Sequence, residues 1–93
     1  MIQTEKVDTV AMHQEAQRMR VEADGILVAV GCPVYHAWQV LRNETLFRNA
    51  LPTNSTARAA VNHKIQEIER ALKLKDRAEK IDVAARAAVV VRS

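Results

Sequence analysis

The feature that most constrains the fold of this chain is a run from Ala57 to Val91 that contains neither glycine nor proline. These two residue types disfavour a helix interior most, by about 1 and 3 kcal/mol relative to alanine. Both glycines and both prolines of the 93 residues lie before this run. The run therefore predicts one long C-terminal helix and places the chain in the all-α class.

The apolar residues of this run occupy two different faces. At about 100° per residue, the seam that begins at Val61 lies nearly opposite the seam that begins at Leu74. One straight helix cannot bury both seams against one neighbour, so we expect residues 74–91 to form an oligomerisation or partner-binding extension, most economically in a homodimer. A break near Lys73–Lys75 that folds the last helix back is the alternative. The first seam comprises Val61, Ile65, Ile68 and Leu72, and the second comprises Leu74, Ala78, Ile81, Ala85 and Ala88.

The N-terminal part predicts a second long helix. Asp8 or Thr9 is suited to cap its start, because a side-chain oxygen there satisfies a free backbone amide. Apolar residues then follow steps of four and three, which keeps one helix face apolar. This phase is kept across Gly25, so we expect the helix to continue through it rather than to end in a turn. The seam residues are Met12, Ala16, Met19, Ala23, Ile26 and Val30.

Between the two long helices, glycine and proline predict turns. Gly31 suits the left-handed residue that ends a helix, and Pro33 suits the first turn of the next one. We expect short helices over residues 33–42 and 44–51, followed by a turn with cap residues at 52–56. The predicted fold is one domain, residues 1–93: a small helical bundle with a long N-terminal helix, two short middle helices and a long C-terminal helix. The inner face of the second short helix would hold Leu46, Phe47, Ala50 and Leu51.

Basic charge is concentrated in the C-terminal part. Residues 1–51 carry a net charge of −1, and residues 52–93 carry a net charge of +4. Four basic residues share one face of the C-terminal helix, which predicts contact with DNA phosphates or with an acidic protein surface. A solubilising face in contact with water has the same pattern. We refer to these four residues as the basic stripe: Arg70, Lys73, Arg77 and Lys80.

No residue pattern predicts catalysis or a cofactor. Cys32 is the only cysteine, which excludes an intramolecular disulfide and a cysteine-cluster metal site. His36 follows Cys32 at ligand spacing, but two ligands do not close a metal site, and no glycine-rich loop offers an oxyanion site. We expect a protein that is not an enzyme. The sequence shows no apolar signal segment and no apolar run of membrane-spanning length, so we also expect a cytoplasmic location without a membrane partner.

The residues around Gly31 fit the spacing of a helix-turn-helix. In that motif, apolar residues on either side of a small turn residue hold two crossed helices, which leaves the outer face of the second helix free for the major groove. The apolar positions here are Ile26, Val30, Cys32, Ala37 and Val40. The outward side chains, which are candidates for binding nucleic acid or another partner, are Tyr35, His36, Trp38, Gln39 and Arg42.

Residues 26–68 as a whole resemble the DNA-binding headpiece of the lactose-repressor family. In that family the motif leads through a loop into a helix with a patterned apolar face, and the matching residues here are Thr56, Val61, Ile65 and Ile68. The chain departs from the family at Leu27, where alanine or glycine is usual, and at Pro33, where serine is usual. The resemblance implies a small DNA-binding regulator. Its phosphate contacts would be Arg58, Lys64 and the basic stripe.

A protein-binding module is the competing interpretation. Tyr35, Trp38 and Arg42 share one helix face, and these residue types are enriched in the hot spots of protein interfaces. In size and style the chain is similar to small inhibitors from phages and mobile elements, including anti-CRISPR proteins. In a third interpretation the two aromatic side chains are core anchors of a plain bundle. DNA reading requires Tyr35, Trp38 and Arg42 to face solvent while Cys32, Ala37 and Val40 face the core.

Overall fold

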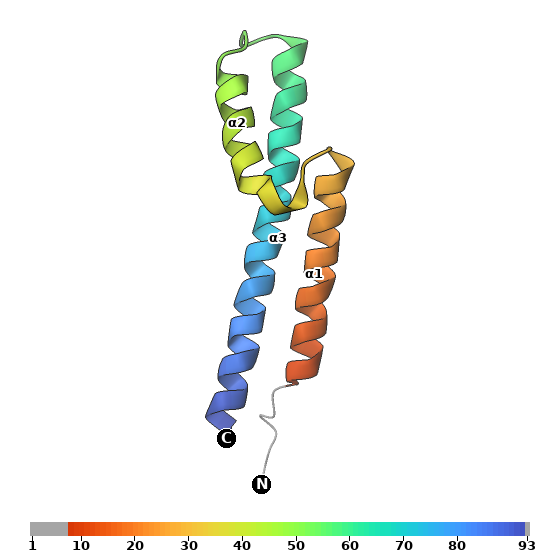
Figure 1. Ribbon diagram of the computed structural model, residues 1–93, viewed down its shortest axis with the longest axis vertical. Helices are drawn as coiled ribbons and strands as arrows, with labels where there is room; N and C mark the ends of the chain where they lie inside the picture. The colour runs from red at the N-terminus through yellow and green to blue at the C-terminus, as the bar shows by residue number, and fades with distance from the viewer. Residues whose placement is uncertain (1–7, 93) are drawn as a thin grey trace.

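The structure, a computed structural model, describes residues 8–92 and the side chains of residues 8–88. This part of the chain consists of α1 (Thr9–Ala29), the 3-10 turn η1 (Val34–His36), α2 (Ala37–Asn49) and α3 (Thr56–Arg92). α2 lies along the first half of α3 and α1 along its second half, both antiparallel to it (Figure 1). The molecule is elongated, with dimensions of 64 × 21 × 19 Å. No described residue forms a strand, so the predicted all-α class is confirmed.

Both ends of α1 have the local structure that the sequence predicted. The Asp8 carboxylate caps the first turn by accepting a backbone hydrogen bond at 3.0 Å. At the other end, Gly31 has a left-handed φ of 71°, which a residue with a Cβ rarely adopts. The backbone amides of Gly31 and Cys32 donate to the carbonyls of Val28 and Leu27. These two bonds form a Schellman motif, which ends α1 and turns the chain toward α2.

The middle of the chain differs from the prediction. Instead of two short α-helices over residues 33–42 and 44–51, it holds the turn η1 and a single helix, α2. Pro33 has an extended backbone with a ψ of 129°, so the α-helix begins only at Ala37. Asn43, the residue between the two predicted helices, does not end α2, because an asparagine in a helix interior costs at most about 0.7 kcal/mol relative to alanine. No glycine or proline interrupts α2.

α3 begins among the predicted cap residues. The Ser55 hydroxyl accepts a hydrogen bond from the Arg58 amide at 3.1 Å and donates to the Pro52 carbonyl at 2.9 Å. α3 then continues without a break at Lys73–Lys75. The single long helix is therefore confirmed, and the alternative in which it folds back is wrong. α1 is likewise continuous through Gly25, as predicted.

One continuous seam along α3 replaces the two opposite seams that we predicted. The prediction failed because Leu74 and Ile81 are only half-buried, whereas Ala71 and Asp82 are buried against α1. Alanines repeat every seven residues on both helices, at 16 and 23 on α1 and at 71, 78 and 85 on α3. A small side chain at each repeat lets two helix backbones approach closely. α1 thus covers the half of α3 that we expected to need a partner from outside.

The predicted homodimer through residues 74–91 stays a prediction. Because α1 covers the inner side of this segment, such a dimer would have to use the outer side, where Val83 is half exposed. The side chains of residues 89–91, which belong to the predicted extension, lie outside the described ones. The described helices include none whose length and apolar composition would let it cross a membrane.

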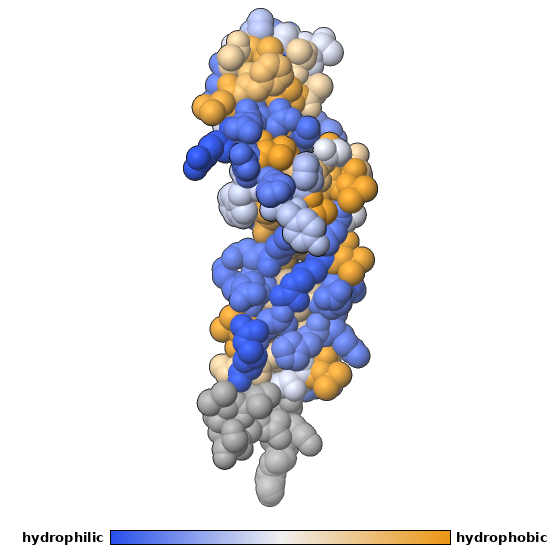
Figure 2. Space-filling model, viewed as in Figure 1, coloured by the Kyte–Doolittle hydropathy of each residue, from blue (hydrophilic) through white to orange (hydrophobic). Residues whose placement is uncertain are grey.

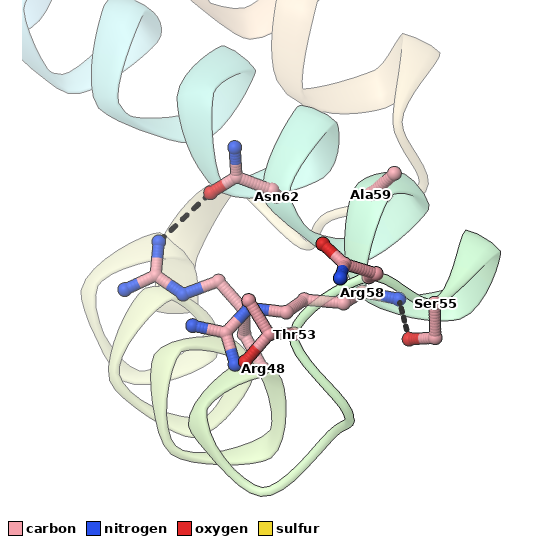
Figure 3. Close-up of a pocket in the computed structure, with 7 residues that line it drawn as sticks. Arg48, Thr53, Ser55, Arg58, Ala59 and Asn62 are labelled. Atoms are coloured by element: carbon pink, nitrogen blue, oxygen red, sulfur yellow. Dashed lines mark hydrogen bonds between the residues drawn. The ribbon is translucent and has the colours of Figure 1, made fainter.

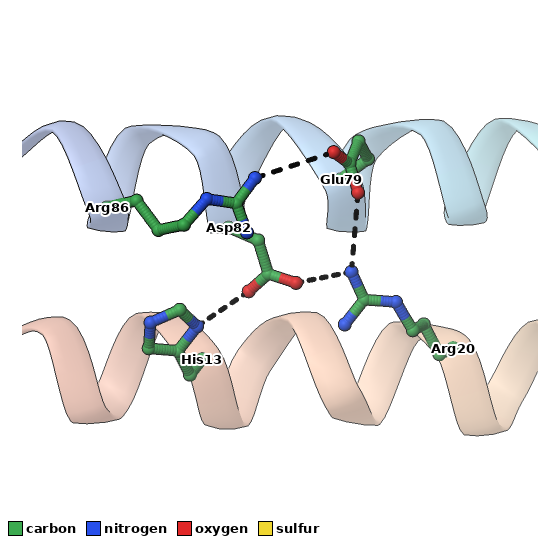
Figure 4. Close-up of polar contacts among 5 residues, drawn as sticks. All are labelled: His13, Arg20, Glu79, Asp82 and Arg86. Carbon is green, nitrogen blue, oxygen red and sulfur yellow. Dashed lines mark hydrogen bonds and ion pairs between the residues drawn. The ribbon is translucent and has the colours of Figure 1, made fainter.

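A charged cluster ties the second half of α3 to α1 (Figure 4). Asp82 is only 8% exposed, and its carboxylate forms hydrogen bonds with His13, at 2.7 Å, and with Arg20. Glu79 lies 3.8 Å from Arg20 and 3.7 Å from Arg86. The bond from Arg20, and then the bond from His13, hold the pKa of the Asp82 carboxyl below its ordinary value.

This cluster fixes the register of the two helices. A slip of seven residues along the α1–α3 contact would again place alanine beside alanine, so the repeat alone does not select one register. The same slip would remove both hydrogen-bond partners of Asp82 and leave a buried charge unpaired, which is unfavourable. The polar cluster therefore supplies the specificity that the alanine repeat lacks.

Candidate functional site

All three aromatic side chains of the protein lie on the surface, on η1 and α2. Tyr35 is 94% exposed, Trp38 is 71% exposed and Phe47 is 53% exposed. The buried core cluster contains aliphatic residues and Cys32 but no aromatic residue. The interpretation of Tyr35 and Trp38 as core anchors is therefore wrong. We name the exposed group at the start of α2 the aromatic corner: Tyr35, Trp38, Gln39 and Arg42.

The opposite end of α2 is also less buried than predicted. Leu46 is 65% exposed, and Phe47 beside it is more than half exposed. The reason is that α2 has a single helical neighbour, α3, and only Ala37 of its residues is buried. Figure 2 shows hydrophobic residues gathered at this end of the molecule, whereas hydrophilic residues cover most of the visible face of the α1–α3 half.

Trp38 lines three adjacent hollows of the surface. One hollow, of about 400 Å³, extends from Trp38 to α3 and is lined by Leu41 and Leu72 among others. A second, of about 520 Å³, is shared with Arg42, and a third, of about 280 Å³, is shared with Tyr35. An exposed ring can insert into a pocket of a partner protein, while side chains of that partner fill the hollows around the ring. Hot spots of protein interfaces have this geometry.

The side chains around Gly31 face in the predicted directions, but the helices are not arranged as we expected. Cys32 and Ala37 are buried, while the aromatic corner and His36 face solvent. Tyr35 and His36, however, belong to η1 rather than to a helix. α1 and α2 each pack on α3 rather than on each other. α1 and α2 therefore pack along different halves of α3 (Figure 1), and the helix-turn-helix resemblance stays a prediction.

Several of the predicted phosphate contacts are paired with carboxylates. Within the basic stripe, Arg70 donates to Glu67 at 2.8 Å, and Lys80 lies 3.1 Å from Asp76. Lys64 pairs at 2.7 Å with a glutamate of α2. Salt bridges at the surface leave little net charge for a distant anion to sense. Half of the basic stripe is therefore neutralised by acids of α3 itself.

Three of the basic side chains that we predicted to bind a partner make no described ion pair. Arg42, Lys73 and Arg77 make no ion pair with any residue whose side chain is described. Lys73 lines the hollow between the tryptophan and α3, and Arg42 lines the adjacent one. Glu69 and Asp76 line the first of these hollows as well. The surface around the aromatic corner is therefore of mixed charge rather than uniformly basic.

The surroundings of Cys32 do not favour a reactive thiol. The Cys32 thiol contacts the carbonyl of Pro33 at 3.6 Å, and its burial raises its pKa. A cysteine nucleophile needs the opposite, a lowered pKa and access to solvent. Within residues 8–88, no three side chains of the His, Cys, Asp and Glu types gather in a way that could hold a metal ion.

A second polar site, at the opposite end of α2, was not predicted as a unit. Arg58, expected to meet phosphates, donates to the Leu51 carbonyl at 3.0 Å. Arg48 donates to Asn62 at 2.8 Å, and the two arginines line one hollow (Figure 3). Nothing in the sequence distinguishes Arg48, because an arginine near the end of a short amphipathic helix is commonplace. We name this site the arginine hollow; it is lined by Arg48, Thr53, Asn54, Ser55, Arg58, Ala59 and Asn62.

Comparison of the chain with models of protein families, with curated proteins and with solved structures found no match. The function is therefore inferred from the surfaces of the molecule itself. The aromatic corner and the arginine hollow, at the two ends of α2, are the surfaces that offer most to a ligand.

Proposed function

We propose that this protein is a small, non-catalytic binding protein that recognises another protein through the aromatic corner. The observation that carries the proposal is the exposure of Tyr35 and Trp38 beside shaped hollows, in a molecule whose core uses no aromatic side chain. Each ring removes about 150–250 Å² of surface from water when a partner covers it. Arg42 adds the third residue type that is common in interface hot spots.

The charges near Trp38 indicate what the partner surface contains. Arg42 and Lys73 make no ion pair within the described part of the chain, and each lines a hollow that Trp38 also lines. A partner with an apolar pocket for the ring and carboxylates at its rim would satisfy both. Such a partner is an acidic protein surface. An elongated molecule that covers it would act as an adaptor or an inhibitor by contact, without chemistry of its own.

Recognition of duplex DNA by the same corner is the second candidate. It is favoured by the outward positions of Gln39 and Arg42, whose side chains suit the edges of adenine and guanine. It is weakened by Glu69, because a carboxylate in the hollow beside Trp38 would repel DNA phosphates. The mixed charge of this surface is the reason that we place a protein partner first.

The proposal is tested by capture followed by reconstitution with matched variants. A partner retained from the host by the tagged chain is identified by mass spectrometry, purified, and titrated into the wild type and into Trp38→Ala, Arg42→Gln and Val21→Ala. Val21 is an exposed control on α1. We expect Trp38→Ala to weaken binding at least about thirtyfold and Arg42→Gln about tenfold. The control should bind as the wild type does.

Two results would contradict a protein partner at this corner. One is that the purified partner binds the Trp38→Ala variant as tightly as the wild type. The other is that a short DNA duplex, and no protein, binds in a way that depends on Trp38 and falls steeply as salt is raised. That second result would establish the DNA candidate, whereas no DNA binding even at low salt would eliminate it.

A further inference from the structure

The arginine hollow holds two cations that reach it from different helices (Figure 3). Arg48 comes from the last turn of α2, and Arg58 comes from the first turn of α3. The hollow has a volume of about 440 Å³ and lies at the end of the molecule away from α1. It is therefore separate from the seam that holds the molecule together.

Neutral acceptors hold both guanidinium groups in place. Arg48 donates to the side-chain oxygens of Asn62, at 2.8 Å, and Asn49, at 3.3 Å. Arg58 donates to the backbone carbonyl of Leu51 at 3.0 Å. A guanidinium group has five N–H donors, so these bonds orient each arginine and leave donors for a ligand. The arginines are thus positioned before any ligand arrives.

No carboxylate balances these two charges. The residues that line the hollow include no acid, and neither arginine makes an ion pair within the described part of the chain. By contrast, Lys64, further along α3, pairs with Glu44 at 2.7 Å. Two cations in one hollow without an acid repel each other in the free protein, and a bound anion would relieve that repulsion.

We propose that the arginine hollow binds a phosphate group. The two oxygens of a carboxylate can be bound by the paired N–H groups of a single arginine. Two arginines from different helices can bind more oxygens, which suits an oxyanion with three or four of them. Thr53 and Asn54, which also line the hollow, add uncharged hydrogen-bonding groups. The ligand is inorganic phosphate or the phosphate of a small phosphate monoester. This site is independent of the aromatic corner and goes beyond the proposed function.

The decisive variant is Asn62→Asp. It places a carboxylate where the amide oxygen already accepts from Arg48, so the protein supplies its own anion with almost no change of shape. We expect this variant to fold like the wild type and to bind phosphate at least about tenfold more weakly. Arg48→Gln should weaken binding to a similar degree. Arg42→Gln removes an equally unpaired arginine at the aromatic corner and should leave phosphate binding unchanged.

Binding is measured by calorimetry and by amide chemical shifts while inorganic phosphate, phosphoserine or acetate is titrated into the full chain at low ionic strength. Saturable phosphate binding that shifts the amides of residues 53–59 and is lost in Asn62→Asp would support the proposal. A response to phosphoserine but not to inorganic phosphate would assign the site to monoesters. The proposal is overturned if no saturable binding occurs, if Asn62→Asp binds like the wild type, or if acetate binds equally well. It is also overturned if duplex DNA engages Arg48 and Arg58 while neither small phosphate does.

Discussion

α1 and α2 pack along the same helix in two different ways. α1 buries four of its residues against α3, whereas α2 buries only Ala37. The α1 contact is built from alanines at heptad spacing and is locked by Asp82, while the α2 region leaves Trp38, Leu46 and Phe47 exposed. Large apolar side chains, which would stabilise the fold if they were buried, thus lie on the surface of α2. The comparison shows that the α1 half is the scaffold, whereas the α2 region carries the exposed surfaces on which both proposed sites lie.

The largest effect on stability is expected in the scaffold. Leu27 is fully buried at the end of α1, so Leu27→Ala should lower the free energy of unfolding by about 2–5 kcal/mol through lost burial and a residual cavity. Leu46→Ala, the same change on α2, should cost no more than about 0.5 kcal/mol. Urea unfolding followed by circular dichroism measures both. Equal losses at the two positions would abolish the distinction between scaffold and surface.

The next largest loss of stability is expected where the alanine repeat sets the distance between α1 and α3. Ala78 is fully buried, and the larger side chain of Ala78→Leu would force the helices apart at a cost of about 1–3 kcal/mol. Ala84→Leu, on the exposed side of the same helix, is the matched control, because leucine has nearly the helix propensity of alanine. A stability of Ala78→Leu equal to that of the control would mean that the two helices are not closely packed.

A smaller, pH-dependent effect is expected from the charged cluster. The pKa of Asp82 is lowered in the folded protein by Arg20 and His13. Below about pH 4, the Asp82 carboxylate therefore takes up a proton more readily in the unfolded chain than in the folded protein. The stabilisation by Asp82 is therefore complete above the ordinary aspartate pKa and is lost as the pH falls through the lower folded-state value. Asp82→Asn should be less stable than the wild type at neutral pH and should lose less stability on acidification.

Urea midpoints measured from neutral to acid pH check this expectation. Asp76→Asn removes an exposed carboxylate of α3 as the control and should follow the wild-type curve closely. Parallel curves for the wild type and Asp82→Asn would show that the cluster does not contribute to the pH dependence.

Local signals predicted the end of α1 and the start of α3, but not the bounds of α2, and long-range packing decided which residues are buried. Gly31 and Ser55 form hydrogen bonds to residues near them in the chain, so the residue types at these positions were enough to locate both turns. Ala71 and Asp82 were missed because alanine occurs on every face of α3 and because an aspartate is normally a surface residue. Only the presence of α1 beside them makes them core residues.

The candidate sites divide in the same way. The residue types of the aromatic corner were visible in the sequence, but their exposure depends on α2 packing chiefly on one long helix, α3. The arginine hollow depends on a turn that brings Arg48 and Arg58 into one concavity, and no periodicity relates the two residues. Sequence analysis therefore found the residues of the first site and only one arginine of the second.

The smallest effect on stability is expected at the aromatic corner. Its size distinguishes a side chain on a binding surface from one that anchors the core. Trp38→Ala removes a ring that is mostly in water, so the free energy of unfolding should change by no more than about 0.5 kcal/mol. In the wild type, the fluorescence of this single tryptophan should be that of an indole in water and should be quenched readily by acrylamide. A loss of stability close to that of Leu27→Ala would make Trp38 part of the scaffold. A stable variant that no longer binds its partner would show that this protein keeps its largest side chain outside its core for recognition.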